Sequence, residues 1–109
     1  MPHLLLVDDD PEALEWLSEL AKGEGFTVSQ ADSLRAARIH MSRLQPDVLL
    51  TDLQLPDGQG IELVNDLESK ETTEVVLITG HASGVDTPAS GRARAEKAAT
   101  ALAVSELRR

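Results

Sequence analysis

Short, continuous apolar runs alternate along the chain with segments in which apolar residues recur every three or four positions. The apolar runs are typical of strands buried on both faces, whereas the longer spaced segments are typical of amphipathic helices. We expect strands at residues 4–7, 26–29, 48–52 and 75–79, with a helix in each interval. Strands alternating with helices predict an α/β fold, a doubly wound parallel sheet covered on both faces.

Capping residues mark where the expected helices begin and end. Asp10 followed by Pro11 is typical of an N-cap and a first helical position, and the glycines at 23 and 25 end that helix. Ser33 is a second candidate N-cap, for a helix that Pro46 closes. The apolar stripes expected to face the sheet are Leu14, Leu17, Leu20 and Ala21; Leu34, Ala37, Met41 and Leu44; and Ile61, Leu63, Val64 and Leu67.

Oxygen-bearing side chains lie where three of the expected strands end. Asp8, Asp9 and Asp10 follow the first strand, Asp52 ends the third, and Thr79 ends the fourth. Ligands of open parallel sheets bind beyond the carboxyl ends of the strands, so these residues form one candidate site. Each feature also has a purely structural interpretation. Aspartates before a proline are typical of a helix cap, an aspartate at a strand end is commonly a turn residue, and threonine favours strands.

The chemistry of such a site depends on how closely its carboxylates lie. Adjacent strands are about 4.8 Å apart, and carboxylates at that spacing either raise a pKa or recruit a cation. Oxygen ligands without cysteine favour Mg²⁺. A carboxylate beside Mg²⁺ can act as a nucleophile towards phosphorus and form an aspartyl-phosphate, while the hydroxyl of Thr79 donates to the phosphoryl oxygens.

Composition narrows the classes of protein that fit this pattern. The 109 residues are enough for one domain, and the absence of cysteine excludes disulfides, thiolate-bound zinc and thiol nucleophiles. No apolar run approaches the roughly 18 residues of a membrane span, and no basic segment opens the chain, so we expect a cytoplasmic protein. A net charge of −9 with only two aromatic residues disfavours direct nucleic-acid binding.

The charge changes along the chain and suggests two parts. Residues 1–83 hold sixteen acidic and five basic residues, whereas residues 84–109 hold three acidic and five basic ones. The second part also has seven alanines and no isoleucine, phenylalanine, tryptophan or methionine. We therefore predict a core over 1–83 and a separate Ala/Arg-rich segment over 84–109, with a helix over about 89–107.

Three dispersed motifs have the spacing of one known family. They are Leu5-Leu6-Val7-Asp8-Asp9-Asp10-Pro11, Asp47-Val48-Leu49-Leu50-Thr51-Asp52-Leu53-Gln54-Leu55-Pro56 with Gly60 eight residues after Asp52, and Val76-Leu77-Ile78-Thr79-Gly80-His81-Ala82. Over residues 3–83 the chain resembles the receiver domain of two-component response regulators. That resemblance implies a flavodoxin-like fold with strand order 2-1-3-4(-5), and a sensor histidine kinase as the phosphoryl donor.

The resemblance also implies roles for individual residues. Asp52 matches the phospho-accepting aspartate, Asp9 the acid that binds Mg²⁺ directly, and Asp8 the acid that acts mostly through water. The main-chain carbonyl of Gln54 would complete the protein ligands of Mg²⁺. The remaining matches are Thr79 as the switch hydroxyl, Gly80 as the small residue that leaves room for the phosphoryl group, and Pro56 and Gly60 as the loop that shapes the site.

The chain departs from the family after residue 83. Receivers continue to a fifth strand that ends in Lys-Pro, but no Lys-Pro occurs here, Lys97 lies in a helix-like stretch, and no aromatic residue follows Phe26. We therefore expect the fifth strand and last helix to be altered or missing, and we assign no residue to the lysine role. The fourth strand would then have an open edge that favours a homodimer, unless residues 84–89 fold back on it. Sedimentation over a wide concentration range distinguishes these outcomes.

The leading functional hypothesis is a phospho-accepting signalling module rather than a turnover enzyme, with its output in a domain or protein outside this chain. The alternative is a switching-defective interaction or dimerisation module that keeps vestigial acids. A Mg²⁺-dependent aspartyl-phosphate hydrolase would need threonine where Glu12 stands. A flavin-binding protein would need a Ser-, Thr- and Gly-rich loop after the first strand, where this chain has acids.

Overall fold

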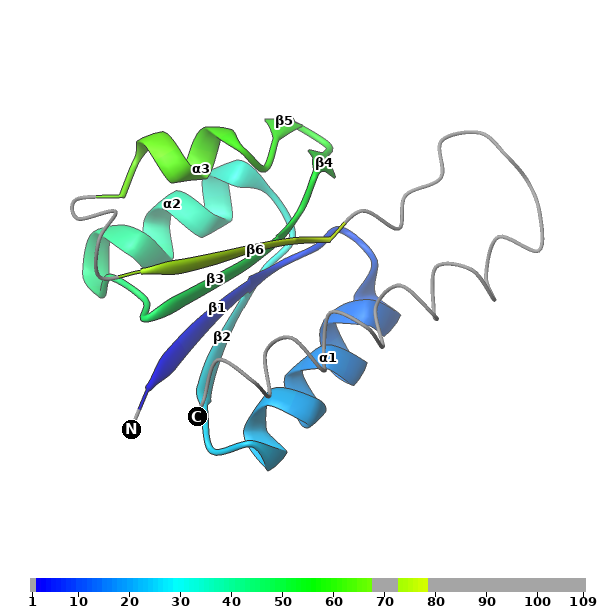
Figure 1. Cartoon of the computed structure of the whole chain (residues 1–109). Coiled ribbons are helices and arrows are strands. Elements are labelled where there is room, and N and C mark those ends of the chain that lie inside the picture. The colour runs from blue at the N-terminus through cyan, green and yellow to red at the C-terminus, as the bar shows by residue number, and fades with distance from the viewer. Residues whose placement is uncertain (1, 68–72, 79–109) are drawn as a thin grey trace.

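A parallel four-stranded sheet forms the centre of the computed structural model, which describes residues 2–67 and 73–78 (Figure 1). The strands lie in the order β2-β1-β3-β6. Their bounds are β1 (His3–Val7), β2 (Thr27–Ala31), β3 (Val48–Asp52) and β6 (Glu74–Ile78). The doubly wound α/β fold and the strand order are confirmed, since β6 takes the place of the expected fourth strand. Thr79 and Gly80 lie outside the described residues, as does the segment 84–109, where we expect the fifth strand and last helix to be altered or missing.

Helices cover the two faces of this sheet. In Figure 1, α1 (Pro11–Gly23) lies on one face, while α2 (Leu34–Arg43) and the short α3 (Glu62–Asn65) lie together on the other. A small antiparallel hairpin of β4 (Gln54–Leu55) and β5 (Gly58–Gln59) follows β3, where the sequence had suggested only a loop. No helix within the described part of the chain has the length and hydropathy of a membrane span.

Alternating side chains along β1 and β3 supply two apolar cores, one on each face of the sheet. Leu4 and Leu6 pack on the α1 side, together with Leu50 of β3. Leu5 and Val7 pack on the side of α2 and α3. Because successive side chains of a strand point to opposite faces, this alternation also determines which way the residues at the strand ends point.

The helix caps form as the sequence predicts. Asp10 is the N-cap of α1, where its Oδ1 accepts from the N–H of Glu12 at 3.0 Å, and Pro11 is the first helical residue. Ser33 is the N-cap of α2, and its Oγ accepts from the N–H of Ala36 at 3.1 Å. These contacts satisfy N–H groups that have no partner inside the helix.

The predicted burial is wrong for several residues of the apolar stripes. Helix α2 ends at Arg43, so Leu44 is an extended C-cap residue whose side chain is 56% exposed. Leu20 is 40% exposed and Ile61, which precedes α3, is 45% exposed. Phe26 lies before β2 rather than in it, although it is buried in the α1-side core. Spacing alone does not decide which flank of an apolar stripe meets the sheet. In α1, Ser18 is buried and Leu20 is not.

Two serines are expected to respond in opposite ways to the same substitution. Ser18 is 2% exposed, and its hydroxyl has no hydrogen-bond partner among residues 2–67 and 73–78. Ser18→Ala therefore removes a buried unsatisfied group and should raise the free energy of unfolding by about 1 kcal/mol. Ser33→Ala removes the cap of α2 and should lower it by about 1 kcal/mol. Urea unfolding measures both. Shifts of the same sign would contradict this account of Ser18.

Candidate functional site

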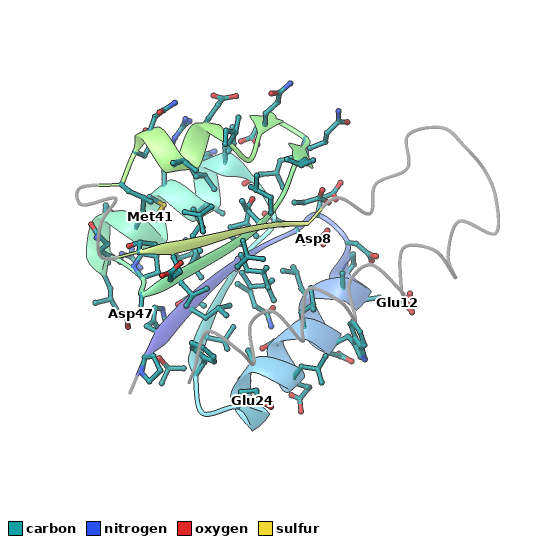
Figure 2. All side chains as sticks on the ribbon, viewed as in Figure 1. Asp8, Glu12, Glu24, Met41 and Asp47 are labelled. Carbon is teal, nitrogen blue, oxygen red and sulfur yellow. The ribbon has the colours of Figure 1, made fainter. Side chains whose placement is uncertain are left out.

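The pairing of β1 with β3 places two acidic residues side by side. The strands are parallel, with Val7 opposite Thr51 in their register, so the residues that follow, Asp8 and Asp52, are neighbours at the carboxyl end of the sheet. Both continue the alternation on the α1 side, the face of Leu6 and Leu50. Figure 2 shows Asp8 at the end of the sheet opposite to Asp47.

Three carboxylates meet at this end of the sheet. One oxygen each from Asp8, Asp9 and Asp52 lies within 4.8 Å of the others. Asp8 is fully buried and Asp52 is 2% exposed, whereas Asp9 is exposed. The cluster therefore has two inner acids and one that faces solvent. The sequence predicted all three members, and the structure brings them together.

Main-chain N–H groups hold the two inner carboxylates. The N–H of Asp10 donates to Asp8 Oδ1 at 3.0 Å, and the N–H of Gln54 donates to Asp52 Oδ1 at 3.3 Å. The N–H of Asp8 itself donates to the carbonyl of Ala31 in β2 at 3.0 Å. Each acid is thus positioned by the turn that follows its own strand, in addition to the strand itself.

The two interpretations of the Asp8-Asp9-Asp10 run divide between its residues. Asp10 turns away to cap α1, as the structural interpretation of the run has it. Asp8 and Asp9 contribute to the carboxylate cluster, as the functional interpretation has it. One run of three identical residues therefore supplies both a helix cap and part of a site.

The donor set of the cluster suits a hard divalent cation. Three oxygen ligands converge from two strand ends, two of them in a buried setting where like charges repel strongly. Mg²⁺ is bound in proteins through one or a few carboxylates and keeps several waters, which the exposed position of Asp9 leaves room for. The residues present therefore fit the ion that the sequence suggested.

Gly60 allows the loop after β3 to return against the end of that strand. Its N–H donates to the carbonyl of Leu53 at 2.9 Å. A Cβ at this position would collide with the main-chain oxygen of Asp52 and would lie 2.7 Å from the Oγ1 of Thr51. Only glycine permits this approach. The structure thus gives a physical reason for the glycine eight residues after Asp52.

Sequence analysis missed the role of Asp57, which lies at the turn of the β4–β5 hairpin. Its Oδ1 accepts from the N–H of Leu34 at 2.8 Å, and its Oδ2 accepts from the N–H of Arg35 at 3.1 Å. Both bonds lower the pKa of Asp57, and the bond from Leu34 has the larger effect. The ionised form therefore stabilises the fold above the unfolded-state pKa, and this contribution is lost as the pH falls through the lowered folded-state pKa.

Charged side chains also join the two helices on that face of the sheet. Arg38 of α2 donates through Nε to Asp66 at 2.8 Å, and its guanidinium lies 3.6 Å from a carboxylate oxygen of Glu62. The hydrogen bond and charge of Asp66 raise the pKa of Arg38. All three side chains are well exposed, so each pair contributes little to stability.

Gln54 lies next to Asp52 in the structure, and the resemblance assigns its main-chain carbonyl to the metal. Gln54 begins β4 two residues after Asp52, and its N–H donates to the carboxylate of Asp52. Asp52 pairs in register with Ile78, the last described residue of β6. Thr79 and Gly80 come next in the chain and lie outside the described residues, so their roles remain predictions.

Comparisons with known proteins agree with this geometry. The family model of response regulator receiver domains matches residues 4–100, beyond the residue 83 at which the motifs end. The DNA-binding response regulator MtrA of Mycolicibacterium smegmatis is 34% identical over 84 residues, which are 77% of this chain and 37% of MtrA. The TorCAD operon transcriptional regulatory protein TorR of Escherichia coli is 33% identical over 87 residues, which are 79% of this chain and 38% of TorR.

Solved structures give the same result. A CheY-like response regulator receiver domain from Methylobacillus flagellatus superposes with a TM-score of 0.67 at 28% identity, over 84% of this chain and 80% of that one. The chain spans less than half the length of the curated regulators above, so it corresponds to one part of them. On its sequence, its fold and the match over residues 4–100, the chain belongs to the family of response regulator receiver domains.

Proposed function

We propose that this chain accepts a phosphoryl group on Asp52 from a sensor histidine kinase, with Mg²⁺ held at the same site. The observation that carries the proposal is the convergence of the Asp8, Asp9 and Asp52 carboxylates within 4.8 Å at the carboxyl end of a receiver-family sheet. Members of this family are regulatory phosphoacceptors rather than turnover enzymes. The proposal assigns that role to this chain through these three residues.

Asp52 is the acid best placed to act as the nucleophile. It ends β3, between β1 and β6, and the N–H of Gln54 orients one of its oxygens. A carboxylate oxygen of Asp52 would attack the phosphorus of a phosphohistidine. The new P–O bond forms as the P–N bond breaks, and the electron pair of that bond returns to the imidazole. Attack by water on phosphorus would later release phosphate and restore Asp52.

The other acids would hold the metal. Asp9, Asp52 and the main-chain carbonyl of Gln54 would coordinate Mg²⁺, with Asp8 acting mostly through water. Bound there, the ion supplies charge neutralisation for the transferring phosphoryl group. Thr79 would donate its hydroxyl to a phosphoryl oxygen, and Gly80 would leave room for the group; both assignments come from the family motif.

The output of the module would lie outside the residues described. The relatives MtrA and TorR are a DNA-binding regulator and an operon regulator, and this chain corresponds to less than half of either. Because the chain has a net charge of −9, which disfavours contact with nucleic acid, we propose that it acts on an attached domain or a partner protein. Sensor kinases draw on ATP, so the proposed function belongs in the cytoplasm.

A second function is favoured by the sequence after Ile78, which has neither a Lys-Pro pair nor an aromatic residue. Without the lysine, the chain would be an interaction or dimerisation module that no longer switches. A homodimer through the edge of β6 remains a prediction; among the described residues, β6 pairs only with β3. Transfer of a phosphoryl group to Asp52 separates the two functions, because an interaction or dimerisation module does not require it.

Incubation with acetyl phosphate and Mg²⁺ tests the proposal without knowledge of the kinase. We expect the chain to gain one phosphoryl group by intact mass, and EDTA to suppress that gain. Asp9→Ala should reduce the uptake rate by at least about ten-fold, since it removes a direct metal ligand. Glu12→Ala, which changes an exposed acid of α1 outside the cluster, is the control. No uptake by the unsubstituted chain would refute the proposal.

A further inference from the structure

The β4–β5 hairpin joins the candidate site to helix α2. Gln54 begins the hairpin beside Asp52, and the pairs Gln54–Gln59 and Leu55–Gly58 hold its two strands together. Asp57 lies in the turn between the strands. A displacement of the turn is therefore passed through two paired positions to Gln54.

Asp57 attaches this turn to the first turn of α2. Its two carboxylate oxygens accept from the N–H groups of Leu34 and Arg35, at 2.8 and 3.1 Å. Ser33 accepts from the next N–H, that of Ala36. The helix end thus has two separate acceptors, one local and one that comes from the hairpin. The carboxylate of Asp57, when ionised, makes stronger hydrogen bonds than the hydroxyl of Ser33.

The approach of hairpin and helix is close enough to limit the side chains there. Gly58 has a φ of +152°, and a Cβ on it would lie 2.5 Å from the Cδ1 of Leu34 and 2.7 Å from the Oε2 of Glu62. Leu55 is buried in the core of the same face, and the N–H of Gln59 donates to Glu62 at 3.0 Å. These contacts pack the two strands of the hairpin against this face, and Asp57 attaches the turn between them to α2.

We propose that Asp57 is a positioning residue for Mg²⁺ at the candidate site, an inference that rests on the function proposed above. By fixing the hairpin tip on α2, Asp57 holds the main chain of Gln54 where its N–H meets Asp52 and its carbonyl is available to the metal. The main chain of Gln54 would move with the hairpin if Asp57 lost its two acceptor bonds. The affinity for Mg²⁺ would then fall although every side-chain ligand is intact.

Titration with Mg²⁺, followed through amide chemical shifts, tests this role. Asp57→Ala should raise the dissociation constant for Mg²⁺ about ten-fold, the lower end of what the loss of outer-shell support costs metal sites. Asp57→Asn, which keeps one acceptor oxygen in place, should recover part of that affinity. Ser33→Ala is the matched control, because it removes an acceptor from the same helix end without touching the hairpin. We expect it to change the constant less than two-fold.

The outcomes separate this inference from the proposed function. An unchanged constant in Asp57→Ala, or equal changes in Asp57→Ala and Ser33→Ala, would overturn the positioning role and leave the metal site in place. An unsubstituted chain that does not bind Mg²⁺ would overturn both. Urea unfolding of each variant ensures that the titrations compare folded chains; if Asp57→Ala does not fold, a constant unchanged in Asp57→Asn would also overturn the inference.

Discussion

Asp52→Asn is expected to abolish phosphoryl uptake completely, whether acetyl phosphate or a kinase supplies the group. The amide of asparagine has nearly the shape of the carboxylate, but it has no anionic oxygen to attack phosphorus. The substitution also removes one charge from three carboxylates that lie within 4.8 Å, so repulsion in the cluster falls. The stability of the metal-free fold should therefore not decrease, and the loss of uptake cannot be attributed to unfolding. Intact mass and urea unfolding measure the two effects.

Asp10→Asn is the control for this substitution. It makes the same chemical change two residues from Asp8, in a residue whose side chain caps α1 and does not belong to the cluster. Asparagine is as good an N-cap as aspartate, so both stability and uptake should stay close to those of the unsubstituted chain. Uptake that persists in Asp52→Asn would show that another residue accepts the phosphoryl group, and the assignment of Asp52 would be wrong.

Gly60→Ala should have the largest effect on stability. The added Cβ would collide with the main-chain oxygen of Asp52 and would approach the Oγ1 of Thr51, which is itself fully buried. Neither atom can move without displacing β3, the strand that carries Asp52. Overpacking of this kind costs about 3 kcal/mol, and we expect the same displacement to slow phosphoryl uptake. Thermal unfolding should show a midpoint lowered by more than about 10 °C.

Gly23→Ala provides the matched control for Gly60→Ala. A Cβ on Gly23 would meet nothing within 4 Å, and the residue lies in the last turn of α1. Alanine is preferred to glycine in a helix, so this variant should be more stable by roughly 0.5 kcal/mol. If Gly60→Ala were as stable as Gly23→Ala, the loop would be free to shift, and the close packing of Gly60 on Asp52 would not matter to the fold.

Much of the site could be predicted because parallel strands obey a simple rule. Each buried strand is a short apolar run, and the residues that follow two neighbouring parallel strands must meet at the same edge of the sheet. Asp8, Asp9 and Asp52 are therefore expected together from the sequence, and the structure brings them together. The helix caps at Asp10 and Ser33 could also be predicted from the sequence, since a cap depends on residues within one turn.

The spacing of residues in the sequence thus indicated the alternation of strands and helices and the acidic edge of the sheet, whereas the order of the strands came from the resemblance to receiver domains. Only the tertiary structure decided that Leu44 and Leu20, both on predicted apolar stripes, face solvent. It alone revealed the contact of Asp57 with Leu34, which joins residues 23 positions apart in the chain. Such contacts leave no periodic signal, because they depend on how a loop and a helix meet after both have folded.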